Sequence, residues 1–471
     1  MSLLSAVARA GPSSQISVHS VQRTLLPSIV PTLNLVDAKR HKTDKAGQQK
    51  RPPTGTPSQA GYLKREEKSN RWRKALLQFR PLPANQLDHP LFNPETEGKL
   101  EVPAFTPKTI TAADSIGQAY EIEPPADDPL RIFGLPRSVH FEFRILTKPY
   151  TVVRQVTKDT VEYLSRAKKQ SSAQNRLVMT GRAGCGKSFL MLQAVEHCVR
   201  DEWIVIYIPR AINLVNSTTP YAYDIRTQTY LQPAYSFQTL QRMLTVNKAK
   251  LAEIPLVEDL VLEKQTLTKG TKLTKVIEFA IAERARTVGQ SPAILDAVMR
   301  SLDVQTDFPV LLAVDEIQAL YGKSSYKDPH FLPIQPYHLS LPRLILEYAS
   351  GKRQFSRGAV LGALSVSQTL HPVPLELSDA LGLEDMHAFP ISPFQKRNKE
   401  MLLYTEGLKK LAVPEKLTLE EATGVFEVWK GRKAIGREGM YYDEMLLGKY
   451  TESAGNARDF VWKGLLNTLE A

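Results

Sequence analysis

The chain has 471 residues, of which 42% are hydrophobic and 23% are charged, and its formal net charge is +12. This composition is typical of a folded globular protein and excludes collagen-like, coiled-coil and wholly disordered chains, and the length predicts about three structural units. No stretch approaches the roughly 18 apolar residues of a membrane-spanning helix, and two cysteines, Cys185 and Cys198, are too few for a disulfide framework.

Residues 1–36 have the composition of an organelle transit peptide. They contain seven serines and two arginines, Arg9 and Arg23, and no acidic residue. We therefore predict a mitochondrial presequence over residues 1–36, which gives the protein a mitochondrial location. A disordered tail without a targeting role is the alternative.

Residues 37–75 concentrate the positive charge of the chain. Between positions 38 and 74 there are twelve Lys and Arg against three acidic residues, so nine of the twelve net charges lie here. Trp72 stands among Arg71, Arg73 and Lys74, and an aromatic ring between cations can stack on a nucleic-acid base. The pattern predicts an RNA-binding arm, with a solvated tail as the alternative.

Residues 76–136 are interrupted by prolines. Thirteen of the 32 prolines lie between positions 52 and 136, and proline disfavours both a helix interior and a central strand. We predict an extended segment over residues 76–136 that lies across a partner.

Residues 137–392 alternate apolar runs with helical patterns, which predicts βαβ units around a parallel sheet flanked by helices. A helix is predicted from Ser188 to Arg200. Strands are predicted at 176–180, 203–208, 310–314, 360–366 and, more weakly, 387–391.

Residues 393–471 are predicted to form a C-terminal helical domain. It has a helix over 394–411, a second opened by the capping box Thr418–Glu421, and a last one through Trp462 and Leu465.

Residues 181–188 match the phosphate-binding loop pattern G-x-x-x-x-G-K-[ST] of P-loop NTPases. The predicted strand before them and the helix after them are the context this loop requires. Lys187 is expected to reach the β- and γ-phosphates, and the Ser188 hydroxyl to bind Mg²⁺. A glycine-rich turn without a ligand is the alternative. The predicted nucleotide-binding residues are Gly181, Arg182, Ala183, Gly184, Cys185, Gly186, Lys187, Ser188, Phe189 and Arg458.

Acidic residues follow the apolar run at 310–314, at the strand end where ligands lie in open α/β sheets. Asp315 is predicted to bind Mg²⁺ together with Ser188, and Glu316 would orient a water molecule if the protein hydrolyses nucleotide. A surface pair of acids is the alternative. Ser365 and Ser367 are predicted either to sense the γ-phosphate or only to cap a strand.

Several of these segments resemble the death-associated-protein family, in a member of the fungal type. The resemblance spans about residues 115–466 and rests on residues 181–188, 203–209, 214–216, 232–233 and 315–320, with upstream support at 115–120 and 134–136. It implies an AAA-like P-loop fold and the GTP-binding protein of the mitochondrial small ribosomal subunit, located in the head near the subunit interface. In related AAA-like ATPases a Gly-Asn-x-Arg motif places its arginine on the phosphates, so Gly455–Arg458 implies that role for Arg458, with the start of a surface helix as the alternative.

The base of the nucleotide is identified only by this resemblance. The Asn-Lys-x-Asp motif with which Ras-type GTPases recognise guanine is absent, so the prediction is GTP or GDP, with ATP still open. The segment Pro149–Val152, which leads into the sheet domain, is the candidate base contact.

The leading function is a structural constituent of the mitochondrial ribosome. Bound nucleotide with Mg²⁺ would stabilise it, and hydrolysis would be slow or absent. The predicted partners are small-subunit mitochondrial rRNA, neighbouring small-subunit proteins and, at the interface, the large subunit, with no membrane span. The alternative is a free AAA-like mitochondrial ATPase or GTPase that uses Glu316 and Arg458 catalytically.

Overall fold

The computed structural model describes residues 100–123, 128–262, 266–282, 288–383, 392, 394–435 and 442–469. The predicted transit peptide, the basic arm with Trp72, residues 76–99 and the predicted strand at 387–391 lie outside the described residues.

The described part of the proline-rich segment, from residue 100 onward, folds onto the sheet domain. The prolines predicted an extended conformation there, whereas the structure has short helices and strands. Pro107 and Pro129 occupy the first turns of two helices, where a missing N–H costs nothing. Phe105, Ile110 and Phe133 are buried at 0 to 2% exposure, and this burial fixes the segment in place. Its elements are α2 (Pro107–Thr111), η3 (Ala113–Ser115), β1 (Ala119–Glu121), α3 (Pro129–Phe133), α4 (Arg137–Ile145), β2 (Tyr150–Val152) and α5 (Gln155–Ala167).

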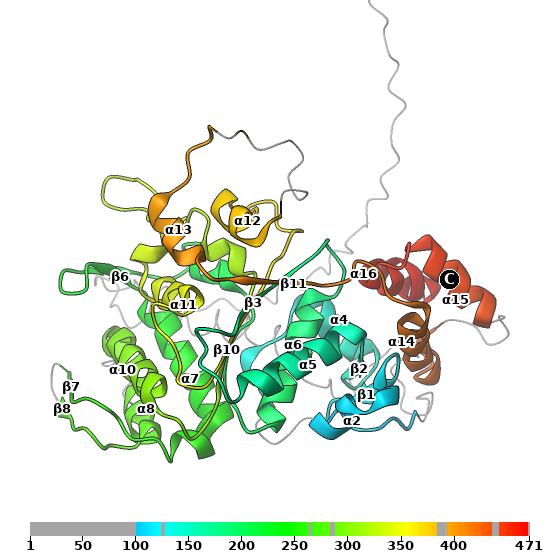
Figure 1. The fold of residues 1–471 in the computed structure, drawn as a ribbon, viewed down its shortest axis with the longest axis horizontal. Coiled ribbons are helices and arrows are strands. Elements are labelled where there is room, and N and C mark those ends of the chain that lie inside the picture. The colour runs from blue at the N-terminus through cyan, green and yellow to red at the C-terminus, as the bar shows by residue number, and fades with distance from the viewer. Residues whose placement is uncertain are drawn as a thin grey trace, which may run out of the picture. The chain divides into compact units, whose positions relative to one another are not determined.

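A five-stranded parallel sheet forms the centre of the fold, in the order β11-β3-β10-β9-β4. Figure 1 labels β11, β3 and β10 of this sheet. The predicted strands at 176–180, 203–208, 310–314 and 360–366 are confirmed with small shifts at their ends. Val360 of β10 lies opposite Arg176 on one side and Leu312 on the other. The strands are β3 (Arg176–Thr180), β4 (Ile204–Ile208), β9 (Val310–Asp315), β10 (Gly358–Ala363) and β11 (Lys409–Ala412).

Each side of the sheet packs against its own hydrophobic core. Alternate residues of β9 divide between them: Leu312 packs into one core, and Leu311 and Ala313 into the other. Because helices cover both faces, the central strands read as continuous apolar runs. One face is covered by α5 and α6 (Lys187–Arg200), and the other by α7 (Pro233–Leu251), α8 (Leu273–Ala282), α10 (Ser291–Val304) and α11 (Ser340–Ser350).

The edge strand β11 replaces part of a predicted helix. The helix expected over 394–411 is wrong: a short helix, α13 (Lys399–Thr405), is followed by β11, which pairs in parallel with β3. The sequence Lys-Lys-Leu-Ala has no strand pattern of its own, so the conformation is set by pairing with the sheet. The sheet therefore includes a strand beyond the domain boundary predicted at residue 392.

Smaller elements connect the strands and helices and lie mainly between β4 and β10. They are η4 (Ala211–Leu214), β5 (Ala222–Asp224), β6 (Thr229–Leu231), β7 (Leu260–Val261), β8 (Thr266–Leu267), η5 (Val288–Gln290), η6 (Ile317–Leu320), η7 (Pro336–His338) and α12 (Leu375–Leu381).

The C-terminal helices form a third core with α4 and β2. Phe426, Trp429 and Phe460 pack there against Ile145 and Tyr150. The predicted capping box is confirmed, because the Thr418 hydroxyl accepts from the Glu421 backbone N–H and the Glu421 carboxylate accepts from the Thr418 backbone N–H. The elements are α14 (Leu419–Gly431), α15 (Tyr442–Glu452), α16 (Ala457–Asp459), the π-helix η9 (Phe460–Leu465) and η10 (Leu466–Leu469), so the predicted last helix is mostly a π-helix.

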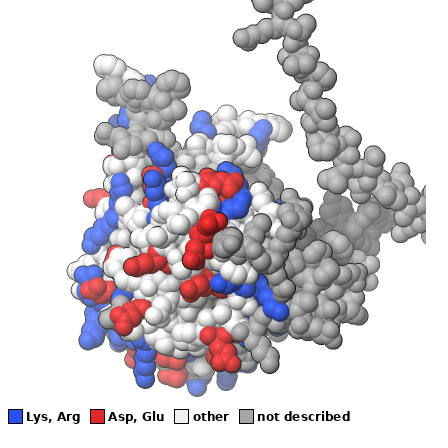
Figure 2. Space-filling model, turned by 90° about the vertical axis from the view of Figure 1, so that its right-hand side faces the viewer, with Lys and Arg blue, Asp and Glu red and all other residues white. Residues whose placement is uncertain are grey.

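Charges on the described surface are mixed in sign. Residues 75–471 together carry a net charge of only +2. On the face shown in Figure 2, basic and acidic side chains are interspersed over the folded part. Within the described ranges, no helix is both long and apolar enough to cross a lipid bilayer.

Candidate functional site

The loop between β3 and α6 takes a shape that only glycine adopts readily at three positions. Gly181, Gly184 and Gly186 have φ values of +137°, +84° and +97°. A Cβ at Gly184 would collide with the Asn456 side-chain oxygen, and one at Gly181 would lie 2.9 Å from the Val413 carbonyl. The loop is therefore packed against two segments that follow β11 in the chain.

Lys187 starts α6 and turns back over the loop. Its ammonium nitrogen donates to the carbonyls of Gly181 at 2.8 Å and Arg182 at 2.7 Å, and it lies 3.6 Å from the Cys185 sulfur. Burial lowers the pKa of Lys187, an effect that neighbouring groups, including Asp315, partly oppose. A buried cation thus stands at the helix N-terminus, where the backbone also attracts anions.

Ser188 and Asp315 lie side by side beneath the loop. Asp315 ends β9 and is 2% exposed. Burial raises its pKa to about 6, while a hydrogen bond from the Ser188 hydroxyl acts in the opposite direction. A carboxylate and a hydroxyl oxygen in contact are ligands suited to Mg²⁺.

Glu316 is adjacent in sequence but is held by other side chains. Its backbone is left-handed, with φ +59°. Gln368 donates to one carboxylate oxygen at 3.3 Å, and Arg210 Nε lies 3.5 Å from the other. Burial is the main cause that raises the pKa of Glu316. One oxygen therefore accepts a hydrogen bond, while the other is buried in the ion pair with Arg210 and accepts no hydrogen bond from the described residues.

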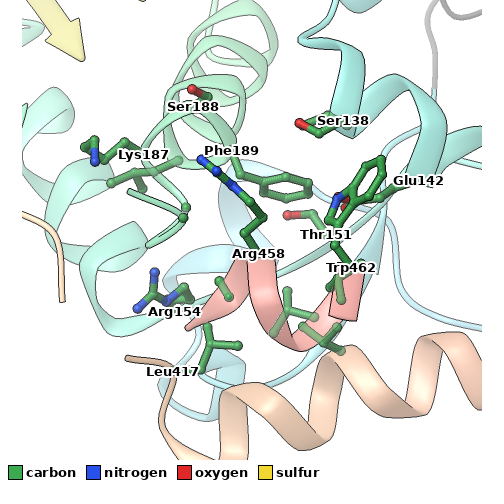
Figure 3. A pocket seen from close by; sticks show the side chains of 18 of the residues that line it. Ser138, Glu142, Thr151, Arg154, Lys187, Ser188, Phe189, Leu417, Arg458 and Trp462 are labelled. Atoms are coloured by element: carbon green, nitrogen blue, oxygen red, sulfur yellow. The ribbon is translucent and has the colours of Figure 1, made fainter. Parts of the chain in front are cut away.

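The start of the last helix is bonded to the loop. Asn456 caps α16 by accepting from the Asp459 backbone N–H, and its side-chain nitrogen donates to the Ala183 carbonyl at 3.0 Å. The Arg458 backbone N–H donates to the Gly184 carbonyl at 3.0 Å. Figure 3 shows the Arg458 side chain directed into the space beside Phe189.

Arg154, which no sequence motif marks, connects three segments. Its guanidinium donates to the Glu421 carboxylate at 3.0 Å, to the Cys185 carbonyl at 2.8 Å and to the Lys416 carbonyl at 3.2 Å. The side chains of Arg154 and Glu421 are only 11% and 4% exposed. This nearly buried ion pair fixes the loop to the first turn of α14.

These elements surround a cavity of about 220 Å³. Lys187 and the loop form one end of the cavity, and the far end is aromatic, with Phe189 and Trp462 on its walls (Figure 3). Of the predicted base segment, Tyr150, Thr151 and Val152 line the cavity.

The predicted site residues divide into three groups. Ala183, Gly184, Gly186, Lys187, Ser188, Phe189 and Arg458 line the cavity, as do Ser365 and Ser367. Gly181, Arg182 and Cys185 shape the loop, and the Arg182 side chain, 79% exposed, pairs with Glu415. Asp315 and Glu316 are buried and are not among the described residues that line the cavity. Sequence reasoning missed Arg154, Glu142 and Trp462, because no local motif marks them.

The backbone of Ser365 is held by a side chain of η6. The Gln318 amide donates to the Ser365 carbonyl and accepts from its N–H, both at 3.0 Å. The two serine hydroxyls lie 3.3 Å apart, beyond the end of β10. Both predicted roles, phosphate sensing and capping, remain compatible with this position.

A family model described as mitochondrial ribosomal death-associated protein 3 matches residues 151–462. The chain is also similar to proteins named small ribosomal subunit protein mS29. It is 26% identical to that of Schizosaccharomyces pombe, over 79% of this chain and 76% of the relative. It is 24% identical to the Neurospora crassa protein, over 74% of this chain and 74% of the relative. It is 27% identical to the Mus musculus protein, over 57% of this chain and 70% of the relative.

Proposed function

Since the chain belongs to the mitochondrial ribosomal death-associated protein 3 family, we propose that it is a constituent of the small subunit of the mitochondrial ribosome. Its relatives in fungi and mouse are named as proteins of the small ribosomal subunit. The leading role is structural, in support of mitochondrial translation.

The second part of the proposal is that the cavity holds a nucleotide with Mg²⁺, in the manner of an AAA-like P-loop NTPase. The observation that carries it is the convergence of Lys187, Ser188 and Arg458 on one cavity, with Asp315 beside Ser188. The positive φ values of the loop glycines suit a loop whose backbone N–H groups turn toward a phosphate. The sheet order β11-β3-β10-β9-β4 brings the ends of β3 and β9 to this site from either side of β10.

The nucleotide would act mainly as a structural cofactor. The cavity is walled by the sheet domain on one side and by the C-terminal helices on the other, so one ligand would contact both. A ligand present at a hundred times its Kd adds about 2.7 kcal/mol to the stability of the folded state. The identity of the base as guanine rests on family membership.

Slow or absent hydrolysis is supported by the contacts of Glu316. A hydrolytic glutamate must orient a water molecule, whereas this carboxylate is engaged by Arg210 and Gln368. The rival function is a free AAA-like ATPase, and the observation that favours it is the position of Glu316 directly after Asp315, with Arg458 on the cavity wall.

The wider partners follow from the family and from the basic segment. We propose that residues 37–75 bind small-subunit rRNA, that neighbouring small-subunit proteins contact the folded part, and that the large subunit is approached at the interface. The nearly neutral folded part supports assigning RNA binding chiefly to the arm.

Nucleotide binding is tested with the purified full-length chain. We expect Mg²⁺-GTP to bind to the unmodified chain and to Glu316→Gln, and Lys187→Ala to weaken binding at least about tenfold because it removes the cation facing the phosphates. The control is Lys275→Ala, on the exposed side of α8, which should bind like the unmodified chain. Equal affinity of Lys187→Ala and Lys275→Ala would refute the site.

The ribosomal role is tested on sucrose gradients of mitochondrial lysate at high salt. Co-migration with the small subunit is expected. Migration as a free protein or a ring-sized oligomer, together with multi-turnover hydrolysis that is lost in Glu316→Gln, would establish the ATPase instead.

A further inference from the structure

The end of the cavity away from Lys187 contains a carboxylate bonded to the Trp462 indole. Glu142 on α4 lines this end, and the Trp462 indole N–H donates to one of its carboxylate oxygens at 2.7 Å. Phe189 stands edge-on to Phe143, with ring centroids 6.1 Å apart. Figure 3 shows Glu142, Trp462 and Thr151 gathered at this end, with Phe189 between them and Lys187.

Glu142 differs from the other glutamate that lines the cavity. Glu421 is committed to Arg154 and to the Thr418 backbone N–H. For Glu142, the hydrogen bond from Trp462 orients the carboxylate and occupies one lone pair, while the second oxygen receives no hydrogen bond from the part of the chain that the structure describes. A carboxylate oriented in this way can still accept two hydrogen bonds from a ligand.

The chemistry of the purine edge decides which base suits this group. Guanine presents two neighbouring donors, N1–H and the 2-amino group, and an ionised carboxylate is an acceptor only. Adenine presents a donor and, at N1, a lone pair, which the carboxylate would repel. The flanking rings of Phe189 and Trp462 offer surfaces for stacking of either base, so they do not discriminate.

We propose that Glu142 is the specificity-determining residue of the site and recognises the N1–H and 2-amino group of guanine. This inference rests on the proposed nucleotide-binding function, because it assigns the base to the far end of the same cavity. It also explains how a chain without the Asn-Lys-x-Asp motif can prefer guanine. Burial raises the pKa of Glu142 to about 7, and two donors from guanine would favour the ionised form.

The test measures the Kd of GTP, ATP and inosine triphosphate for the full-length chain, slightly above pH 8 so that Glu142 is ionised. The unmodified chain should prefer GTP to ATP. In Glu142→Gln this preference should fall by about ten- to a hundredfold, because an amide can donate to adenine N1 and accept from its amino group. Glu162→Gln, exposed on α5, is the matched control and should keep the original preference.

Inosine triphosphate separates a direct contact from an indirect effect. It lacks only the 2-amino group, so it should bind the unmodified chain more weakly than GTP, and Glu142→Ala should bind the two about equally. Unchanged GTP to ATP and GTP to inosine triphosphate ratios in the Glu142 variants would overturn the assignment while leaving the nucleotide site in place. Absence of binding of any nucleotide to the unmodified chain would overturn the proposed function and this inference together.

Discussion

Substitution of Arg154 by alanine tests whether the loop and the C-terminal helices form one cooperative structure. The guanidinium links α14 to the loop through Glu421 and the Cys185 carbonyl, at 3.0 and 2.8 Å. Because the two side chains are 11% and 4% exposed, solvent can replace little of what is lost. The substitution leaves Glu421 buried, with the Thr418 N–H as its remaining donor at 3.1 Å.

The expected cost follows from this burial. Removing one partner of a buried ion pair costs about 3 to 5 kcal/mol, and the donor that remains to Glu421 favours the lower end, about 3 kcal/mol of unfolding free energy. The pair of Arg300 and Glu258 is the matched control, because its side chains are 56% and 65% exposed. Arg300 also pairs with Asp296, and because a surface pair contributes about 0 to 1 kcal/mol, Arg300→Ala should cost little.

The assay is urea unfolding of the full-length chain, followed by far-ultraviolet circular dichroism. We expect Arg154→Ala to lower the unfolding midpoint clearly and Arg300→Ala to leave it almost unchanged. Adding Glu421→Gln to Arg154→Ala should restore part of the loss, since it removes the uncompensated buried charge. The reasoning is refuted if Arg154→Ala costs no more than Arg300→Ala, or if the double variant is destabilised by the full sum of the single costs.

Two further predictions concern a buried acid and a glycine. Burial is the main cause that raises the pKa of Glu196 from its ordinary 4.5 to about 8, so stability should fall as the pH rises between these values, where the unfolded chain has already lost the proton. The free energy of unfolding of Glu196→Gln should therefore exceed that of the unmodified chain by about 3 to 5 kcal/mol near pH 9 and match it near pH 5. The exposed Glu162→Gln should be as stable as the unmodified chain at both pH values. Equal pH dependence of all three proteins would contradict this prediction. Gly184→Ala should lower both the thermal midpoint and the GTP affinity, because its Cβ would collide with Asn456 and its φ is +84°. Gly270 has a φ of +87° and no atom close to an added Cβ, so Gly270→Ala measures the stability cost of the backbone conformation alone. An equally small loss of stability in both variants would exclude the predicted collision.

The parts of the fold that the sequence predicted are those encoded within a few consecutive residues. The strands β3, β4 and β9 can be recognised in the sequence as continuous apolar runs, because strands covered on both faces need no polar positions. The glycines and Lys187 of the loop, and the capping box at Thr418, are likewise local signals that depend on backbone geometry alone.

Tertiary structure decided what depends on packing between distant segments. β11 is a strand only because β3 offers an edge to pair with, and residues 100–123 fold only because buried side chains such as Phe105 find a core. The contacts that complete the candidate site join residues far apart in the chain: Arg154 and Glu421 are separated by 267 positions, and Glu142 and Trp462 by 320. Local propensity carries no information about such pairs, because their side chains converge only after the sheet and the C-terminal helices have packed.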